Sequence, residues 1–280
     1  MTPSSNQSNH EVFHCRDYEL PWGKKTYIMG ILNVTTDSFS DGGKYQDLER
    51  AVERAQQMVA EGADIIDIGG ESTRPGFVPV DAEEEIRRVV PVIERLVVAL
   101  KVPLSIDTTK AQVGRKALEA GAHIINDIWG LQREPELARI SAEFDAGVIV
   151  MHNNDSDVYE DIMADIAAFL RKSIAIARQA GIRESSILLD PGIGFGKTLQ
   201  GNLETMRRLG ELKALGFPVL LGPSRKSMIG KVLNLPVHER VEGTAAAVAL
   251  GIAYGVDVVR VHDVQAMKRV AAMTDAMVRV

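Results

Sequence analysis

Residues 28–69 read IMGILNVTTDSFSDGGKYQDLERAVERAQQMVAEGADIIDIG, with two apolar runs on either side of one helical segment. The runs, residues 28–34 and 65–69, are apolar nearly throughout, as expected of strands that are buried on both faces. Between residues 48 and 59, apolar side chains recur every three or four residues, which is the spacing of an amphipathic helix. Gly62 follows this helix, at a position where glycine commonly ends one. The stretch therefore predicts a strand, a helix and a second, parallel strand.

The same unit repeats along the rest of the chain. Six more apolar runs follow, at residues 104–107, 123–128, 148–151, 187–189, 219–221 and 258–261. Helical spacing returns between several of them, for example in residues 86–100 and 162–180. Eight such units in 280 residues predict an α/β protein with a single-domain (β/α)8 TIM barrel over residues 11–280. An open doubly wound sheet remains the alternative, because periodicity does not reveal the order of the strands.

The residues before the first barrel strand do not follow the repeating strand–helix pattern. Residues 11–20 are expected to add a strand or hairpin that closes the bottom of the barrel. Residues 1–10 are rich in Ser and Asn and predict a disordered tail. Residues 1–10 lack the charged-then-apolar pattern of a signal peptide.

Composition limits the classes of function. The formal net charge of -6 argues against nucleic acid as the main partner, since phosphate backbones favour a basic surface. The longest apolar run, at residues 245–252, is too short to span a bilayer, so we expect no membrane contact and a cytoplasmic location. Cys15 is the single cysteine, which rules out an internal disulfide, and we interpret it as structural.

Polar residues stand where the predicted strands end. In a parallel barrel these ends meet at one mouth, where catalytic side chains lie. One such residue alone has a structural explanation: Asp is a favoured helix N-cap, and a single His or Arg is usually hydrogen-bonded or solvated. When many polar residues gather on one rim of the barrel, a ligand or a hydrogen-bond network must compensate for their burial. These residues are Asn33, Asp67, Asp107, Asn126, Asp127, His152, Asp190, Lys226, Arg260, His262 and Asp263.

The rim residues divide by chemistry. Asp107, Asn126 and Asp190 suit a flat, amidine-like heterocycle, because a carboxylate pairs with an N–H/NH2 edge and an amide both donates and accepts. Arg74, together with Arg260 and His262, suits phosphate oxygens. Asn33 offers a carbonyl oxygen for Mg²⁺, a cation that takes few protein ligands.

Seven segments together resemble the dihydropteroate synthase family of pterin-binding enzymes, from about residue 27 to the C-terminus. No single motif is decisive, but their order and barrel spacing are very specific. The segments are 30–43 (GILNVTTDSFSDGG), 64–76 (DIIDIGGESTRPG), 103–110 (PLSIDTTK), 124–128 (IINDI), 189–197 (LDPGIGFGK), 224–230 (SRKSMIG) and 260–264 (RVHDV).

The resemblance implies an enzyme that condenses 6-hydroxymethyl-7,8-dihydropterin pyrophosphate with p-aminobenzoate to give 7,8-dihydropteroate and pyrophosphate. It implies Mg²⁺ as cofactor, sulfonamides as inhibitors and a homodimer that involves the Ala- and Gly-rich helix at residues 240–254. The implied roles are as follows: catalysis by Asp107, Lys226, Arg260 and Asp37; pterin binding by Asp67, Asp107, Asn126, Asp190 and Lys226; pyrophosphate binding by Asn33, Arg74, Arg260 and His262; p-aminobenzoate binding by Phe39, Thr73, Pro75 and Ser227; metal binding by Asn33.

Three other functions fit parts of this pattern. A pterin-binding methyltransferase acting on methyltetrahydrofolate would share Asp107, Asn126 and Asp190, but it has no use for a pyrophosphate clamp. A Schiff-base aldolase would use Lys226, yet such lysines usually lie in a desolvated pocket within a strand, and this one follows Arg225 in a polar loop. A barrel that binds pterin without turnover would not need the intact set of charged residues.

Overall fold

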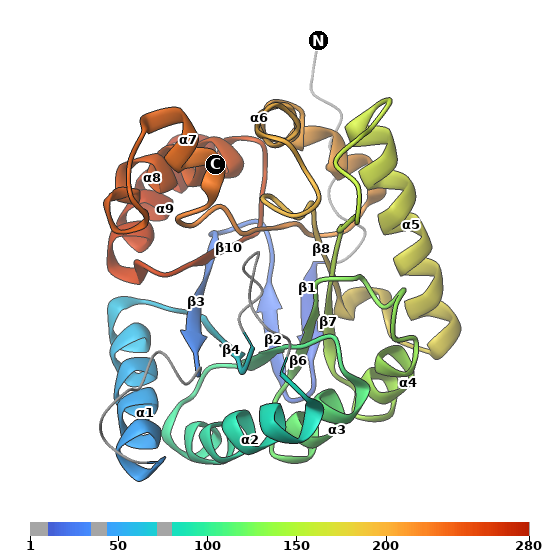
Figure 1. Cartoon of the computed structure of the whole chain (residues 1–280), viewed down its shortest axis with the longest axis vertical. Coiled ribbons are helices and arrows are strands. Elements are labelled where there is room, and N and C mark those ends of the chain that lie inside the picture. The colour runs from blue at the N-terminus through green and yellow to red at the C-terminus, as the bar shows by residue number, and fades with distance from the viewer. Residues whose placement is uncertain (1–10, 35–43, 72–79, 280) are drawn as a thin grey trace.

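A parallel eight-stranded sheet forms the centre of the molecule (Figure 1). The structure, a computed structural model, describes residues 11–34, 44–71 and 80–279. The strand order is β8-β7-β6-β5-β4-β3-β10-β9, and a parallel bridge from Leu189 to Val219 joins the two ends of the sheet. The strands are β3 (Tyr27–Asn33), β4 (Ile65–Gly69), β5 (Leu104–Asp107), β6 (Ile124–Asp127), β7 (Gly147–Met151), β8 (Ile187–Asp190), β9 (Leu220–Leu221) and β10 (Val258–Val261). The sheet is thus a barrel, as predicted, and the open-sheet alternative is wrong.

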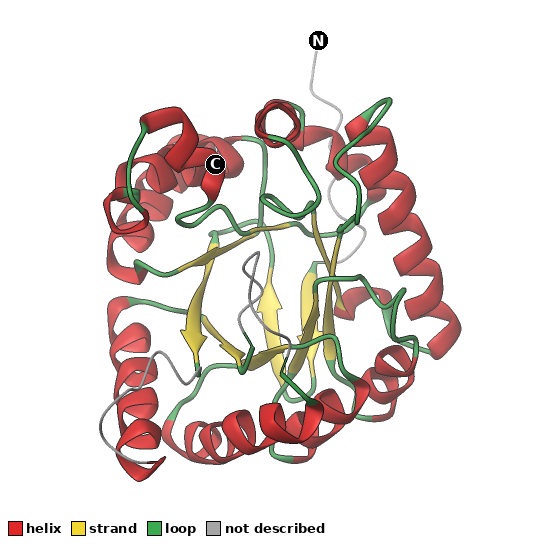
Figure 2. Ribbon diagram, in the orientation of Figure 1, coloured by secondary structure: helices red, strands yellow, loops and turns green. Residues whose placement is uncertain are grey.

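Helices surround the strands on the outside of the barrel (Figure 2). Their ends carry the expected caps: the Asp161 carboxylate accepts from Met163 N and Ala164 N, and Gly181 adopts a left-handed φ of 91°. The α-helices are α1 (Lys44–Glu61), α2 (Ala82–Ala99), α3 (Ala111–Glu119), α4 (Glu136–Glu143), α5 (Ile162–Ala180), α6 (Leu199–Arg207), α7 (Ser227–Leu233), α8 (Val241–Ala253) and α9 (Val264–Val278). Short 3-10 helices are η2 (Glu184–Ser186), η3 (Leu209–Leu215) and η4 (Val237–Glu239).

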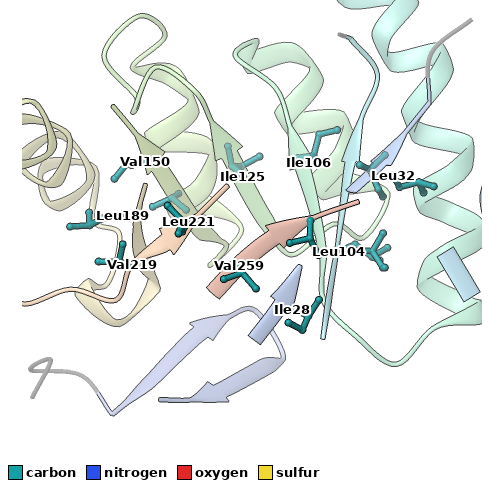
Figure 3. Packing of buried hydrophobic residues seen from close by; sticks show 14 of the residues in the cluster. Ile28, Leu32, Leu104, Ile106, Ile125, Val150, Leu189, Val219, Leu221 and Val259 are labelled. Carbon is teal, nitrogen blue, oxygen red and sulfur yellow. The ribbon is translucent and has the colours of Figure 1, made fainter. Parts of the chain in front are cut away.

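Successive residues of each strand face opposite sides, and this alternation produces two cores. The outward set packs under the helices, and Figure 3 shows members of it such as Ile106, Ile125 and Val259. The inward set begins with an apolar layer inside the barrel: Met29, Ile65, Ile124, Ile149, Leu188, Leu220 and Val258. Both sets are buried, which explains why the strands are apolar nearly throughout.

A hairpin of β1 (Val12–Cys15) and β2 (Tyr18–Pro21) packs against the inner apolar layer. Phe13 and Cys15 are fully buried in it. Burial raises the pKa of the Cys15 thiol to about 12, with a smaller contribution from Asp17, so the thiol is protonated. The predicted closing hairpin is therefore confirmed, and Cys15 is part of the core. The predicted tail at residues 1–10 lies outside the described residues.

The inner layer also determines where polar residues point. Two residues further along the same strands from Ile65, Ile124, Leu188 and Val258 are Asp67, Asn126, Asp190 and Arg260. A step of two keeps a side chain on the same face, so these groups also point into the barrel, nearer its C-terminal end. The fold thus brings polar side chains from separate strands to one mouth.

Candidate active site

A pocket of about 330 Å³ opens at the C-terminal end of the barrel. Its walls come from strand ends and from the segments that follow β6, β8 and β9. The lining residues are Asp107, Asn126, Ile128, Met151, Asp190, Ile193, Phe195, Gly222, Lys226 and Arg260. Five of the residues predicted at the mouth, Asp107, Asn126, Asp190, Lys226 and Arg260, therefore line one cavity.

A charged network forms the floor of this pocket. Arg260 Nε donates to Asp67 Oδ2 at 2.6 Å, and Arg260 Nη2 donates to Asp107 Oδ2 at 2.7 Å. Asn126 Nδ2 donates to the same Asp67 oxygen at 3.2 Å. Asp67 is fully buried and is not among the residues that line the pocket. It therefore lies beneath the pocket and orients Arg260 and Asn126, in keeping with the expectation that Asp67 belongs to the floor of this site.

The charges of this network stabilise one another. Burial raises the pKa of Asp107, while the nearby Arg260 guanidinium lowers it. Burial disfavours the Arg260 cation, but Asp67 and Asp107 outweigh that effect and the pKa of Arg260 rises. Removing any one of these groups would leave a buried charge without its partner, which is strongly destabilising.

Asp190, the last residue of β8, forms another part of the wall. Its Oδ1 accepts from Gly192 N at 2.7 Å. Burial raises the pKa of Asp190 to about 6, opposed by the Gly192 N–H and by Lys226, Arg260 and Lys197. Its other oxygen, Oδ2, lies 4.0 Å from the point where a Cβ on Gly222 would stand. A Cβ at residue 222 would therefore make only ordinary van der Waals contact with this carboxylate, and Gly222 lines the pocket beside it.

Lys226 reaches the pocket from the segment after β9. Its Nζ lies 3.9 Å from the centre of the Phe195 ring, a cation–π distance. A Cβ on Gly194 would come within 2.8 Å of the Lys226 side chain. The loop between β8 and α6 thus packs directly against this lysine.

His262 follows β10 at the rim. Its Nδ1 lies 3.0 Å from Ser224 Oγ, and its backbone N donates to the same oxygen at 3.2 Å. Beside it, Arg225 forms a two-pronged ion pair with Asp263, with distances of 3.0 and 2.5 Å. This pair ties the β9–α7 segment to the start of α9, so Asp263 has a structural role.

The end of β3 is suited to a hard cation. The Asn33 amide oxygen is 3.8 Å from the point where a Cβ on Gly69 would stand, and Asp107 Cβ is 3.9 Å from the same point. The described residues contain no group of three or more His, Cys, Asp or Glu that could hold a metal by themselves. The Asn33 amide oxygen is the type of hard ligand that Mg²⁺ accepts in proteins.

Several predicted site residues lie elsewhere. Ser227 is the first residue of α7, is exposed and does not line this pocket. The Asp127 carboxylate accepts from Trp129 N and Leu131 N, which places it in the turn after β6 and not at the mouth. The remaining predicted residues fall outside the described residues: Asp37, Phe39, Thr73, Arg74 and Pro75.

The apolar part of the pocket was not predicted. Ile128 and Gly222 could have been found by stepping two residues along the strand from Asn126 and Leu220. Met151 could have been found in the same way from Ile149. Ile193 and Phe195 belong to the β8–α6 loop, and no sequence period applies to a loop of this kind.

The family model of pterin-binding enzymes matches residues 29–262. The chain is 54% identical to dihydropteroate synthase of Clostridium beijerinckii over 258 residues, covering 92% of the chain and 96% of that relative. It is 52% identical to dihydropteroate synthase of Bacillus subtilis over 267 residues, covering 95% and 94%. Identity at this level over nearly the whole chain decides against the methyltransferase, aldolase and non-catalytic alternatives.

Solved structures give the same result. A dihydropteroate synthase from Clostridium difficile, determined with pteroic acid, matches with a TM-score of 0.91 and 53% identity, covering 93% of this chain and all of that one. The Xanthomonas albilineans enzyme with 4-aminobenzoic acid matches with a TM-score of 0.91 and 42% identity, covering 97% and 100%. The Yersinia pestis enzyme with a sulfonamide drug complex has a TM-score of 0.87 and 42% identity, covering 95% and 98%.

Proposed function

Since the chain belongs to the dihydropteroate synthases, within the pterin-binding enzymes, we propose that the pocket at the barrel mouth is where it joins its two substrates. The reaction condenses 6-hydroxymethyl-7,8-dihydropterin pyrophosphate with p-aminobenzoate. A C–N bond forms at the pterin methylene, the C–O bond to the diphosphate breaks, and the amine loses one proton. The products are 7,8-dihydropteroate and pyrophosphate.

The pterin ring occupies the polar wall of the pocket. Asp190 accepts from the N–H/NH2 edge of the pyrimidine ring, Asn126 exchanges hydrogen bonds with it, and Lys226 donates to a ring acceptor. Ile128, Met151, Ile193 and Phe195 supply the apolar contacts for the flat faces of the ring, and all four line the same pocket. Asp67 contributes from below by fixing Asn126 and Arg260.

The diphosphate lies on the side of the mouth formed by β10 and β3. Arg260 donates two hydrogen bonds to carboxylates and has five N–H groups, so it keeps donors for phosphate oxygens. His262 and Arg74 add donors, and Asn33 would hold Mg²⁺ by its amide oxygen. Such an ion supplies positive charge at the leaving group when it is bound.

The charged side chains of the site match the charges that develop on the substrate during the reaction. As the C–O bond breaks, negative charge grows on the leaving diphosphate and positive charge grows on the pterin methylene and ring. The Arg260 and Arg74 cations and the His262 ring as a donor stabilise the first, and the carboxylates of Asp107 and Asp190 stabilise the second. The arylamine is a weak nucleophile, so stabilising a cation-like carbon is the more effective route to C–N bond formation. Asp37 contributes to catalysis from the segment after β3.

We assign the p-aminobenzoate site to Phe39, Thr73, Pro75 and Ser227, on the resemblance to the family. Structures of relatives with 4-aminobenzoic acid and with a sulfonamide drug support this substrate and this inhibitor class for the present chain. No helix in the described part of the chain is long and apolar enough to cross a membrane.

A homodimer is part of the proposal. α8 contacts both α7 and α9, and the three helices lie together at one corner of the molecule (Figure 1). They carry large apolar side chains that are exposed in the single chain: Val232, Leu233, Leu250, Met273, Met277 and Val278. A second copy covering this corner would bury them.

The convergence of Asp107, Asn126, Asp190, Lys226 and Arg260 on one cavity is the observation that carries the site assignment. Pyrophosphate release, followed with both substrates and Mg²⁺, tests it in the wild type and in Arg260→Lys. We expect the wild type to release pyrophosphate only with p-aminobenzoate present, and the variant to lose at least about a hundredfold in kcat/KM, because Lys cannot bridge both carboxylates. Unchanged kinetics in Arg260→Lys would contradict the assigned role.

A further inference from the structure

Lys197, in the loop between β8 and α6, has a buried side-chain ammonium that the assigned roles do not use. Its Nζ lies 2.9 Å from Gly192 O, 3.0 Å from Phe195 O and 2.9 Å from His152 Nδ1. A lysine ammonium has three N–H groups and no acceptor. All three are satisfied when Lys197 is protonated and His152 accepts with Nδ1, carrying its own proton on Nε2.

His152 provides a fixed anchor for this lysine. It directly follows β7, its ring packs edge-on against Phe169 at 5.0 Å, and its backbone N donates to Asp190 O at 2.9 Å. Burial, together with the Lys197 charge, lowers the pKa of His152 to about 3. The ring is thus a neutral acceptor at physiological pH, and it connects β7 with the loop after β8.

The loop that Lys197 holds presents groups to the pocket. Gly192 N donates to Asp190 Oδ1 at 2.7 Å, and Lys197 binds the carbonyl oxygen of the same glycine. Lys197 also binds the carbonyl oxygen of Phe195, whose ring lies under Lys226. One ammonium therefore restrains both the residue that orients Asp190 and the residue that contacts Lys226.

We propose that Lys197 is a positioning residue for the pterin site, which holds the β8–α6 loop against His152 and keeps Asp190 correctly oriented as an acceptor. The inference rests on the proposed pterin contact of Asp190. It adds a residue that touches neither substrate and acts through Gly192, Phe195 and the local field.

The charges around Asp190 agree with this role. The cations that face it come from three elements: Lys197 from its own loop, Lys226 from the segment after β9, and Arg260 from β10, where Asp107 shares the guanidinium. Burial lowers the pKa of Lys197 to about 7, and Asp190 opposes that change. Since Lys197 is one of the three cations that lower the pKa of Asp190, removing it moves the titration of Asp190 to higher pH.

Lys197→Met, which keeps the length of the side chain and removes its charge, tests the proposal. Calorimetry with 6-hydroxymethyl-7,8-dihydropterin pyrophosphate gives the pterin affinity, and inorganic pyrophosphate serves as a second probe. We expect the pterin Kd to rise about tenfold or more, with the pyrophosphate Kd within about twofold of wild type. Pterin affinity falls at low pH, and in the variant this fall, the acidic limb of the plot of affinity against pH, should occur at higher pH than in the wild type. Lys172→Met, on the exposed face of α5, is the matched control.

Lys197→Arg keeps the positive charge, so its pterin affinity should fall at the same low pH as in the wild type. Its planar guanidinium fits the three acceptors less well, which does not change this expectation. A pterin Kd and an acidic limb unchanged in Lys197→Met would overturn the proposal, as would equal loss of pterin and pyrophosphate binding. If Lys197→Met does not fold, Lys197→Gln replaces it, with the same criteria. A wild-type protein that binds no pterin at all would contradict the proposed function, whereas normal binding in the variant contradicts only the role of Lys197.

Discussion

Asp190 illustrates how this fold prepares one residue for a substrate. Burial raises the pKa of the carboxyl, and a backbone N–H with three cations opposes that effect. A hydrogen bond to a charged group contributes about 1.5–3 kcal/mol, and a carboxylate pairs with two N–H groups of a pterin edge. We therefore expect Asp190→Asn to raise the Kd of the pterin substrate about a hundredfold, as measured by calorimetry. The exposed Asp165→Asn, on α5, is the control and should bind like wild type.

The pH dependence of pterin affinity follows from the same residue. The acceptor form of Asp190 is the carboxylate, and its pKa is raised from 3.8 to about 6. Pterin affinity should thus be high above pH 6 and fall as the pH drops through 6, because protonation removes one acceptor. Titrations between about pH 5 and about pH 8 measure this. An affinity that stays constant over that range would contradict Asp190 as the acceptor.

Sequence predicted the residues at the strand ends well and the loop residues poorly. Asp107, Asn126 and Asp190 were identifiable because a strand fixes both the face and the height of each residue. Lys197 was visible only as part of a Gly-rich motif, and nothing in that motif shows that its ammonium turns inward to His152. Asp67 was identified as a site residue. The hydrogen bond that it accepts from Arg260 could not be predicted, because the sequence does not reveal which carboxylates the guanidinium reaches.

Among the elements, the β8–α6 loop is the most constrained by backbone contact. Gly192 has a φ of +70°, and a Cβ there would come within 1.9 Å of His152 O. Gly181 has a φ of +91° with nothing within 4 Å of its Cβ position. Gly181→Ala should cost about 1–2 kcal/mol, the left-handed penalty alone. Gly192→Ala should cost clearly more in urea unfolding and should also weaken pterin binding. Equal costs for the two variants would show that the contact with His152 O is unimportant.

The end of β7 should make stability depend on pH. The pKa of His152 is lowered from 6.5 to about 3, so the unfolded chain binds a proton at a pH where the folded chain does not. Stability is then fully present above pH 6.5 and declines as the pH falls below it. We expect His152→Gln, which is neutral and keeps an acceptor for Lys197, to show a smaller loss of Tm between about pH 7 and about pH 5. His238→Gln, at an exposed histidine, should keep the wild-type slope.

Most elements could be predicted from the sequence alone. The helix predicted at residues 162–180 has these bounds in α5, and the closing hairpin is present as β1 and β2. The last strands are less regular: residues 219–221 were predicted as a strand, and β9 covers only Leu220 and Leu221. Val219 instead makes the isolated bridge to Leu189. Apolar runs predict burial, and burial does not reveal how many ladder hydrogen bonds a run forms.

At the scale of the whole molecule, the proposed homodimer is open to a direct test. Sedimentation at micromolar concentration should give twice the chain mass of 30.5 kDa. Replacing both Met273 and Met277 of α9 by Glu should shift the protein toward monomer, because the exposed apolar side chains of that corner would carry charge. Val98→Glu, at a residue of α2 that is 89% exposed, should leave the mass unchanged. A wild type that sediments as a monomer would refute the dimer.

Closure of the barrel is the part of the architecture that the sequence left undecided. Eight β–α units fit an open sheet as well as a barrel, and the difference lies in whether the first and last strands meet. Here β10 pairs with β3, and the chain around β9 pairs with β8. That outcome depends on strand tilt and stagger, which are properties of the assembled sheet.

The isolated bridge between Leu189 of β8 and Val219, just before β9, has a consequence for local opening of the barrel. This seam has few ladder bonds, so amide hydrogens along it should exchange with solvent earlier than those of the longer strands. Asp190 stands on one side of the seam, and Gly222 and Lys226 stand on the other. A pterin bound between them would contact both the end of β8 and the segment after β9. Bound substrate should therefore slow deuterium uptake at this bridge more than elsewhere in the barrel.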